Sequence, residues 1–523
     1  MNSRSWLVLA LCFASAASSS RVHAAPSAPG FPKKVSGLVT SPLATGRQPD
    51  GMVRLYFSIG DELHCLQANG RGCDGFPVAL GQKVAVLGLP AVGDLDGDGV
   101  EEVAVALSDG RVVVVKADGV PLAGFSFRAP KGLQAGPSFL QLDGERRPEL
   151  VVGDKEGRLH ALRADGSERA GFPIGTGGAV TSAASAGLLG EPARLALVWG
   201  NEEGRVYAAD SRGKALPGFP AVTGYLVSGQ PAIGDLDGDG LNEVAVASQD
   251  FKVYAVRHDG SLLPGYPVAV GARLLSGPAL GDLDGDGRLE LVVAATDGQL
   301  HALDTRGQPL KGFPVKLGER LVGAALVADL DRDGEEEVLA TTADGKLHVL
   351  KANARAFPGF PARLEGLPDS GPVVIELDGQ VLIAQAAGER ASAFKVRRVG
   401  KSARPFAWPE PGHDSARGGR RFPNPPSFAD LQISPKTPVT DDELKASYRF
   451  FDLDGDPEPG TEVRWFREGK EVPELAGKLS VPAAKTAKGQ RWRFELSAPG
   501  AVSRQSAEIV IANSSPGAPK ITF

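Results

Sequence analysis

The chain has 523 residues and a formal net charge of −6, and 42% of its residues are apolar. It contains 67 glycines and 40 prolines, well above average usage, and both residue types shorten helices and strands. This composition argues against long helices, coiled coils and helical solenoids, and the apolar content argues against a disordered chain. No run of lysine and arginine dominates the sequence, which argues against nucleic acid as the main partner.

The first residues have the pattern of a secretory signal peptide. Arg4 precedes the short apolar run Trp6–Phe13, and the residues up to Ala24 provide a small-x-small cleavage site. The apolar run is too short to span a bilayer, and an uncleaved anchor is the alternative. We therefore predict that residues 1–24 are removed and that the protein is secreted, extracellular or at the cell surface, with the periplasm as a further location. We expect no transmembrane segment after signal cleavage.

Two cysteines remain after this cleavage. Cys65 and Cys73 are eight residues apart in CLQANGRGC, on either side of a Gly-containing turn. In an exported protein such a pair predicts a disulfide, and two buried thiols are the alternative.

A repeat of 47 residues dominates the chain. The string GDLDGDG begins at Gly93, Gly234 and Gly281, and the variant ADLDRDG begins at Ala328, so the gaps are 141, 47 and 47 residues. A Gly-Phe-Pro marker or a close variant recurs in phase with these strings. Its aromatic residues are Phe31, Phe76, Phe125, Phe172, Phe219, Tyr266, Phe313, Phe360 and finally Trp408. Nine markers enclose eight units.

Each unit reads as four short strands with glycine at the corners. In residues 271–318 the apolar runs LLSGPALGDL, LELVVAAT, QLHALDT and LKGFPVKL are separated by DGDG, DG and RG turns. Such a sheet buries its faces only against neighbouring copies, which predicts an all-β fold with a β-propeller at residues 25–421. A β-helix and an array of small domains are the alternatives. Eight blades are favoured over seven, and a strand beside either Phe31 or Trp408 could close the ring.

The GDLDGDG strings predict calcium sites. Oxygen-bearing side chains recur at positions 1, 3, 5 and 9 of each loop, and a backbone carbonyl is available at position 7. The predicted ligands are Asp94, Asp96, Asp98, Val100 and Glu102; Asp235, Asp237, Asp239, Leu241 and Glu243; Asp282, Asp284, Asp286, Arg288 and Glu290; and Asp329, Asp331, Asp333, Glu335 and Glu337. An EF-hand has its last acid at position 12 and is excluded. The alternative is an Asp-Gly turn that binds nothing, but like-charge repulsion within four such loops argues against it.

The other four units have lost this set of acids. Unit 1 retains little beyond Asp50, and unit 3 keeps Asp143, Glu145 and Glu149 but has Gln141 at the first position. Unit 4 has Leu188 and Gly190 in place of acids, and unit 8 has Glu376 and Asp378 followed by a deletion. We therefore predict four sites with a structural role. His64, His160, His301 and His348 share one repeat position with Tyr and Val residues, which indicates packing and not metal binding. No HExxH, GxSxG, P-loop or Cys/His metal pattern is present, and we predict that the protein is not an enzyme.

The repeat resembles the FG-GAP or VCBS family of bacterial β-propellers, which is related to the N-terminal head of integrin α subunits. The GDLDGDGxxE strings, the EVAVA and ELVVA runs that follow them, and the recurrent GFP carry this resemblance over about residues 30 to 415. The resemblance implies that the acids of the loops are calcium ligands, and it leaves the partner open.

The sequence changes character after the repeats. Residues 422–427 are a proline-rich linker, and residues 428–513 read as about seven strands around Trp465, typical of an Ig-like or fibronectin type III sandwich. The segment resembles Ig-like modules of large bacterial surface proteins that carry a SYRFFDLDGD…VRWFREG pattern. We interpret Asp452–Asp456 as a turn, because Pro457 follows where the calcium loops have glycine, and residues 514–523 as a tail.

These features favour a calcium-binding adhesion or interaction protein without enzymatic activity. Its partner would be an extracellular or envelope protein or a glycan. One alternative is a lectin that uses exposed residues among its five tryptophans. A propeller enzyme, either quinoprotein-like or active on polysaccharides, is the other, but the vicinal cysteines expected of a quinoprotein are missing.

Overall fold

The computed structural model describes residues 25–48, 51–142, 147–377, 379–400, 427–451, 460–497 and 504–512. Several predicted features lie outside these residues. They are the signal peptide at 1–24, Asp50, Asp143, Glu145, Asp378, the marker Trp408, the linker residues 422–426, the Asp452–Asp456 turn and the tail at 514–523.

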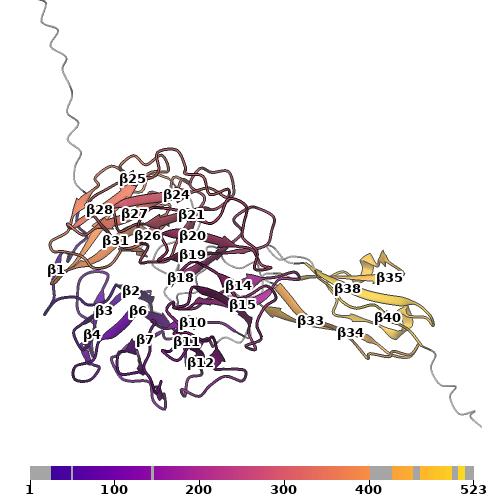
Figure 1. Ribbon diagram of the computed structural model, residues 1–523. Coiled ribbons are helices and arrows are strands. Elements are labelled where there is room, and N and C mark those ends of the chain that lie inside the picture. Colours follow the sequence, from indigo (N-terminus) through magenta and orange to yellow (C-terminus); the bar gives the residue numbers. More distant parts are fainter. Residues whose placement is uncertain are drawn as a thin grey trace, which may run out of the picture.

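The described residues up to position 400 form eight four-stranded antiparallel sheets, which we number as blades in chain order (Figure 1). The first strands of successive blades contact one another from β2 (Ala44–Arg47) to β26 (Leu321–Ala328), and β2 also contacts β30 (Val373–Leu377) of blade 8. The first strands therefore surround the axis of a ring. This arrangement confirms the predicted β-propeller and selects eight blades over seven.

In blades 1 to 7, four consecutive strands lie side by side in chain order. Blade 1 consists of β2, β3 (Val53–Ile59), β4 (Glu62–Gln67) and β5 (Val78–Ala79). Blade 2 consists of β6 (Val86–Gly93), β7 (Glu102–Leu107), β8 (Arg111–Val115) and β9 (Phe127–Arg128). Blade 3 consists of β10 (Ser138–Leu140), β11 (Glu149–Gly153), β12 (Arg158–Leu162) and β13 (Ile174–Gly175). Blade 4 consists of β14 (Ser185–Leu189), β15 (Arg194–Gly200), β16 (Arg205–Asp210) and β17 (Ala221–Val222).

Blade 5 consists of β18 (Val227–Gly234), β19 (Glu243–Ser248), β20 (Lys252–Val256) and β21 (Val268–Ala269). Blade 6 consists of β22 (Ala279–Gly281), β23 (Glu290–Ala294), β24 (Gln299–Leu303) and β25 (Val315–Lys316). Blade 7 consists of β26, β27 (Glu337–Thr342), β28 (Lys346–Leu350) and β29 (Ala362–Arg363). Blade 8 consists of β30, β31 (Gln380–Ala387), β32 (Arg390–Lys395) and β1 (Lys33–Lys34).

The N-terminal strand closes the ring. Strand β1 is the outer strand of blade 8, where Lys33 pairs with Ala391 and Lys34 with Arg390. Of the two closures that the sequence left open, the structure therefore has the one beside Phe31. The first and last parts of the propeller share one sheet, which joins its two ends through backbone hydrogen bonds.

The recurrent Gly-Phe-Pro has a packing role between blades. Gly218 and Gly265 have φ values of 80° and 97°, which favour glycine. A Cβ atom on Gly218 would collide with the carbonyl oxygen of Asp259, and one on Gly265 with that of Arg306. Both oxygens belong to the turn before the outer strand of the next blade. Glycine at this marker therefore lets neighbouring blades approach each other closely, which explains its recurrence at the period of the blade.

The second strand of each blade is the most buried. All five side chains of β23 (ELVVA) are buried, as are all six of β19 (EVAVAS). An uninterrupted apolar run of this kind is typical of a strand covered on both faces. Each blade thus packs one face of its sheet on the preceding blade and the other on the following blade. Glu243 and Glu290, which begin β19 and β23, are buried with the rest of these two strands.

The C-terminal residues form two further antiparallel sheets. One contains β33 (Ser427–Ser434), β34 (Leu444–Phe451) and β37 (Ser480–Val481). The other contains β35 (Glu462–Arg467), β36 (Lys470–Glu471), β38 (Arg491–Ser497), β39 (Arg504–Gln505) and β40 (Ile509–Val510). Two 3₁₀ turns, η1 (Pro473–Leu475) and η2 (Ala483–Lys485), complete the set. Trp465 is fully buried against Trp492 and Phe494, so the predicted core tryptophan lies in the core.

Among the described residues, no helix has the length and apolar character needed to cross a membrane.

Candidate metal sites

The four acidic loops occupy the same place in blades 2, 5, 6 and 7. Each loop connects the first strand of its blade to the second. In blade 2 the first aspartate follows β6 directly, and Glu102 begins β7 opposite Gly93 in the strand pairing. Glu243, Glu290 and Glu337 pair in the same way with the last residues of β18, β22 and β26. The two paired strands therefore fix the first and last acids of every loop.

Backbone N–H groups orient the aspartates within the loop. In blade 2, Gly97 N donates to Asp94 Oδ1 at 2.7 Å and Gly99 N donates to Asp94 Oδ2 at 2.9 Å. Asp98 N donates to Asp96 Oδ1 at 3.1 Å, and Val100 N donates to Asp98 Oδ1 at 2.8 Å. Asp and Asn side chains commonly bond to the backbone two residues ahead in this way. These hydrogen bonds fix the orientation of each carboxylate without the help of a ligand.

These turns bring carboxylate oxygens together in all four loops. In each loop, one oxygen from each of three acids lies within 4.8 Å of the other two. The groups are Asp94, Asp96 and Glu102; Asp235, Asp237 and Asp239; Asp282, Asp284 and Glu290; and Asp329, Asp331 and Asp333. Ca²⁺ prefers such clusters of oxygens. The carbonyl ligands predicted at Val100, Leu241, Arg288 and Glu335 stay predictions.

The glutamate at position 9 gives the clearest sign that a cation fits. Glu102 and Glu337 are 0% exposed, and Glu243 is 1% exposed. One oxygen of each accepts a hydrogen bond from the backbone of the residue after the first aspartate, at 2.8, 2.9 and 3.0 Å for Leu95, Leu236 and Leu330. The other oxygen, Oε1, is buried and makes no hydrogen bond among the described residues. An unsatisfied buried carboxylate oxygen is costly, and a divalent cation would satisfy it.

Burial also changes the acidity of these glutamates. It raises the pKa of Glu102 to about 7 and the pKa values of Glu243, Glu290 and Glu337 to about 8. The neighbouring aspartates of each loop raise these pKa values further by repulsion. Without a cation, each loop therefore holds an acid that resists ionisation near neutral pH.

In blades 3 and 8, an arginine forms an ion pair with a remaining glutamate. Glu149 of blade 3 stands where the other blades have Glu102 or Glu243, and it forms an ion pair with Arg169. Glu376 of blade 8 forms an ion pair with Arg332, which comes from the acidic loop of blade 7. Neither ion pair is predicted from the sequence, because Arg169 and Arg332 lie 20 and 44 residues from their glutamates. Where the set of acids is lost, a guanidinium group thus supplies positive charge to a remaining glutamate.

Basic residues also approach three of the four acidic loops. Lys116 Nζ lies 2.7 Å from Asp96 Oδ2 and 2.8 Å from Asp98 Oδ2 in blade 2. Arg257 lies 3.7 Å from Asp237 in blade 5, and Lys351 lies 3.6 Å from Asp333 in blade 7. Each follows the third strand of its blade directly. Lys116, Arg257 and Lys351 were not predicted to approach the loops. They occupy one position of the 47-residue repeat, so an alignment of the units brings them together.

The four histidines at one repeat position lie on the third strands. His160, His301 and His348 are buried, and His64 stacks on Phe57. The predicted packing position accounts for them. Of the five tryptophans, Trp199, Trp465 and Trp492 are buried, while Trp6 and Trp408 lie outside the described residues. The described tryptophans are therefore not available for stacking on a sugar.

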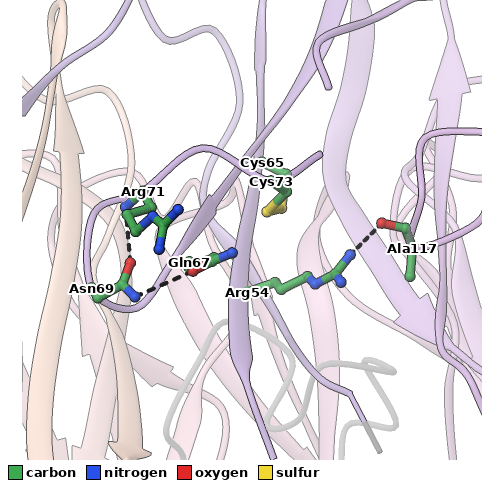
Figure 2. Close-up of a disulfide and its surroundings, with 7 residues drawn as sticks. All are labelled: Arg54, Cys65, Gln67, Asn69, Arg71, Cys73 and Ala117. Atoms are coloured by element: carbon green, nitrogen blue, oxygen red, sulfur yellow. Dashed lines mark hydrogen bonds between the residues drawn. A yellow bond between two sulfur atoms is a disulfide. The ribbon is translucent and has the colours of Figure 1, made fainter. Parts of the chain in front are cut away.

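Cys65 and Cys73 form a disulfide with a Cα–Cα distance of 5.4 Å (Figure 2). It closes the turn between β4 and β5, where Cys73 N also donates a hydrogen bond to Cys65 O at 3.2 Å. Figure 2 also shows Arg54 of blade 1 reaching the carbonyl oxygen of Ala117 in blade 2. The pair predicted from the sequence is thus bonded in the structure, beside a contact between two blades.

A central cavity of about 310 Å³ lies at the other end of the first strands. The beginnings of the first strands and the residues before them line it, whereas the acidic loops follow the ends of these strands. A second cavity of about 280 Å³ lies between blades 8 and 1 and shares Pro42, Asp369 and Ser370 with the first. Leu275 lines the central cavity and is 55% exposed, while Leu38 and Leu367 line the second and are 64% and 69% exposed. The face opposite the acidic loops is therefore hollowed and exposes three leucines beside its cavities.

Comparison with known proteins supports the repeat and the fold. Residues 235–293 match the FG-GAP-like repeat family. The biofilm matrix protein Bap1 of V. cholerae is similar in structure, with a TM-score of 0.50 and 12% identity over 73% of this chain and 90% of that chain. Sqt1 of Saccharomyces cerevisiae has a TM-score of 0.51 and 14% identity over 72% of this chain and 100% of that chain. The sequence has no significant match among curated proteins. The chain thus carries an FG-GAP-like repeat in an eight-bladed all-β propeller that is followed by further β-sheets.

Proposed function

We propose that this protein is a non-enzymatic, calcium-stabilised interaction protein of the cell exterior. The observation that carries the proposal is the buried Oε1 atom of Glu102, Glu243 and Glu337, which makes no hydrogen bond among the described residues and which a divalent cation would satisfy. Ca²⁺ suits these loops, because it accepts many oxygen ligands in a flexible geometry. The aspartates at positions 1, 3 and 5 and the glutamate at position 9 would hold it.

The role of calcium in this proposal is structural. Each loop joins two strands of one blade, and the bound ion would cancel the repulsion between acids that those strands hold together. Exterior location agrees with the Cys65–Cys73 disulfide, because disulfides persist in oxidising compartments. The signal peptide predicted at residues 1–24 agrees with the same location.

The partner-binding face in this proposal is the one opposite the acidic loops. Leu38, Leu275 and Leu367 expose more than half of their side chains beside the two connected cavities. Exposed apolar groups around a concavity commonly mark an interaction site. We favour a protein partner over a glycan, because the described tryptophans are buried and offer no stacking surface.

The experiment is affinity capture of envelope and extracellular proteins by the full mature chain in calcium, repeated in EGTA. The variants Leu275→Ser and Leu367→Ser test the face. Val120→Ser is the matched control, because Val120 is 54% exposed in the turn between β8 and β9 and lines neither cavity. We expect a partner that is retained in calcium, reduced in EGTA and in both leucine variants, and unchanged with Val120→Ser. Equal capture by all variants would refute the assignment of the face.

A further inference from the structure

We infer that the four acidic loops are not equivalent calcium sites, and that the blade 6 loop binds calcium first and most tightly. The residue directly after the third strand of each blade sets the order. This residue is Lys116 in blade 2, Arg257 in blade 5, Asp304 in blade 6 and Lys351 in blade 7. The inference rests on the proposed calcium binding and extends it to the individual loops.

The distances rank the basic residues by how closely they engage the loop. Lys116 has oxygens of two aspartates within 2.8 Å, so its ammonium group already neutralises Asp96 and Asp98. Arg257 and Lys351 stand farther away, at 3.7 Å from Asp237 and 3.6 Å from Asp333. In blade 6 no basic residue forms an ion pair with any acid of the loop among the described residues.

The glycine at position 4 of the loop shows a second difference. In blade 2 a Cβ atom on Gly97 would collide with the side chain of Arg147, and in blade 5 one on Gly238 would lie 3.7 Å from Arg288 Cγ. In blade 6 a Cβ atom on Gly285 would have no atom within 4 Å. Arginines from the next blade thus lie over the blade 2 and blade 5 loops, whereas the blade 6 loop is uncovered.

The blade 6 loop also opens into a cavity of about 800 Å³ that it shares with the blade 7 loop. Asp282, Asp284 and Asp286 line this cavity on one side and Asp329 lines it on the other. Lys311 and Lys351 also line it, but neither forms an ion pair with a blade 6 acid among the described residues. The Oδ1 atoms of Asp282 and Asp329 are buried and make no hydrogen bond among the described residues, and Asp329 is only 4% exposed. An ion can therefore reach the blade 6 acids from solvent without displacing an ion pair.

Elementary electrostatics turns these differences into an order of affinity. A calcium ion entering blade 2 must displace the Lys116 ammonium group or bind beside it, and either event costs free energy. In blade 6 the corresponding residue is an aspartate, whose charge attracts the ion. Its Oδ1 accepts hydrogen bonds from Arg306 N and Gln308 N at 2.9 and 2.7 Å, which hold the carboxylate in its own turn, and the inference uses its charge. Calcium sites elsewhere are likewise tuned by the number of nearby charges.

The test is calorimetric titration of the calcium-free full chain with CaCl₂. We expect several classes of site in the unchanged protein. Asp284→Asn should remove the tightest class, and Asp96→Asn should leave it intact. Asp304→Lys should weaken the tightest class by roughly tenfold or more, because two units of charge change near a divalent ion. Lysine suits this turn, since Lys116 and Lys351 occupy the same position.

A matched control for Asp304→Lys exists at the same repeat position in blade 4. Asp210 in blade 4 accepts hydrogen bonds from Arg212 N and Lys214 N as Asp304 does in blade 6, but blade 4 has no acidic loop. Asp210→Lys should therefore leave every class of site unchanged. Lys116→Met should tighten the weakest class, whereas Lys214→Met should have no effect.

The outcomes separate this inference from the proposed function. Absence of calcium binding in the unchanged protein would overturn both. Binding with one class of four equal sites, or a tightest class that survives both Asp284→Asn and Asp304→Lys, would overturn the inference and leave calcium binding in place. Circular dichroism spectra of the calcium-free variants establish that each is folded before titration.

Discussion

The backbone nitrogen of Val399 donates a hydrogen bond to the carbonyl oxygen of Asp331 at 2.8 Å. Gly400 N donates to the same oxygen at 3.0 Å. Asp331 is a predicted ligand in the blade 7 loop, and Val399 and Gly400 belong to the chain that leaves the last blade. The end of the propeller is therefore fastened to one of the acidic loops.

We predict that calcium slows hydrogen exchange at the amides of Val399 and Gly400. A bound ion would hold Asp331 in place and so strengthen both hydrogen bonds. The amide of Val35 serves as the control, because it donates to Glu389 O at 2.9 Å in the ring closure, away from every acidic loop. Equal exchange of the Val399 and Gly400 amides in calcium and in EGTA would show that the loop and the exit segment are uncoupled.

Replacing a buried glutamate should have opposite effects with and without calcium. Glu243 has to take up a proton to be buried at pH 7, because its folded pKa is about 8. Glu243→Gln removes this cost, so we expect the calcium-free protein to gain roughly 1–3 kcal/mol of unfolding free energy at pH 7. In saturating calcium the same change removes a ligand and should lower the unfolding free energy. Urea unfolding in EGTA and in calcium measures both effects. A loss of stability in both conditions would mean that Glu243 serves packing alone.

The stability of the calcium-free protein should fall as pH rises from about 4.5 to about 8. Folding raises the pKa of Glu243, Glu290 and Glu337 from the ordinary 4.5 to about 8, so between these values the folded chain binds more protons than the unfolded chain. The stabilisation is complete below the ordinary pKa and is lost as pH passes the folded pKa. Saturating calcium should reverse the trend, because it favours the ionised glutamates. Thermal melting across this pH range, in EGTA and in calcium, measures the two slopes.

Removing the arginine of blade 3 should destabilise the protein without regard to calcium. Arg169→Met removes the guanidinium group that pairs with buried Glu149, and breaking a buried ion pair in this way costs about 3–5 kcal/mol. Adding Glu149→Gln to the same chain should restore most of the loss. Urea unfolding of the single and double variants makes the comparison. A calcium-dependent loss in Arg169→Met would show that blade 3 also takes part in metal binding.

The repeat and the acidic loops could be predicted from the sequence, because both are local and periodic. The spacing of Asp94, Asp235, Asp282 and Asp329 predicts the number of intact loops, and the strand pairing opposite each glutamate follows from the repeat. Counting the markers favours eight blades over seven, and the eight sheets of the structure decide it. Only the pairing of β1 with β32, a contact between the two ends of the propeller, decides between the two closures.

Side-chain contacts between segments that lie far apart in the sequence could not be predicted in this way. Arg169 reaches Glu149 from 20 residues away, and Arg332 reaches Glu376 from 44 residues away in the next blade. Arg169 belongs to no repeated motif, and Arg332 replaces the glycine of the acidic string, so no local pattern predicts either ion pair. Lys116 and Asp304 share a repeat position and have opposite charges. The effect of these charges on ion binding can be inferred only from the structure, in which Lys116 contacts the acids of its loop.

Differential scanning calorimetry of the full mature chain in calcium and in EGTA tests the central claim most directly. Each site that binds only the folded chain adds about 2.7 kcal/mol at a calcium concentration one hundred times its Kd. We therefore predict a melting temperature that is clearly higher in calcium than in EGTA, with magnesium giving a smaller increase. An unchanged melting temperature in EGTA would contradict the account.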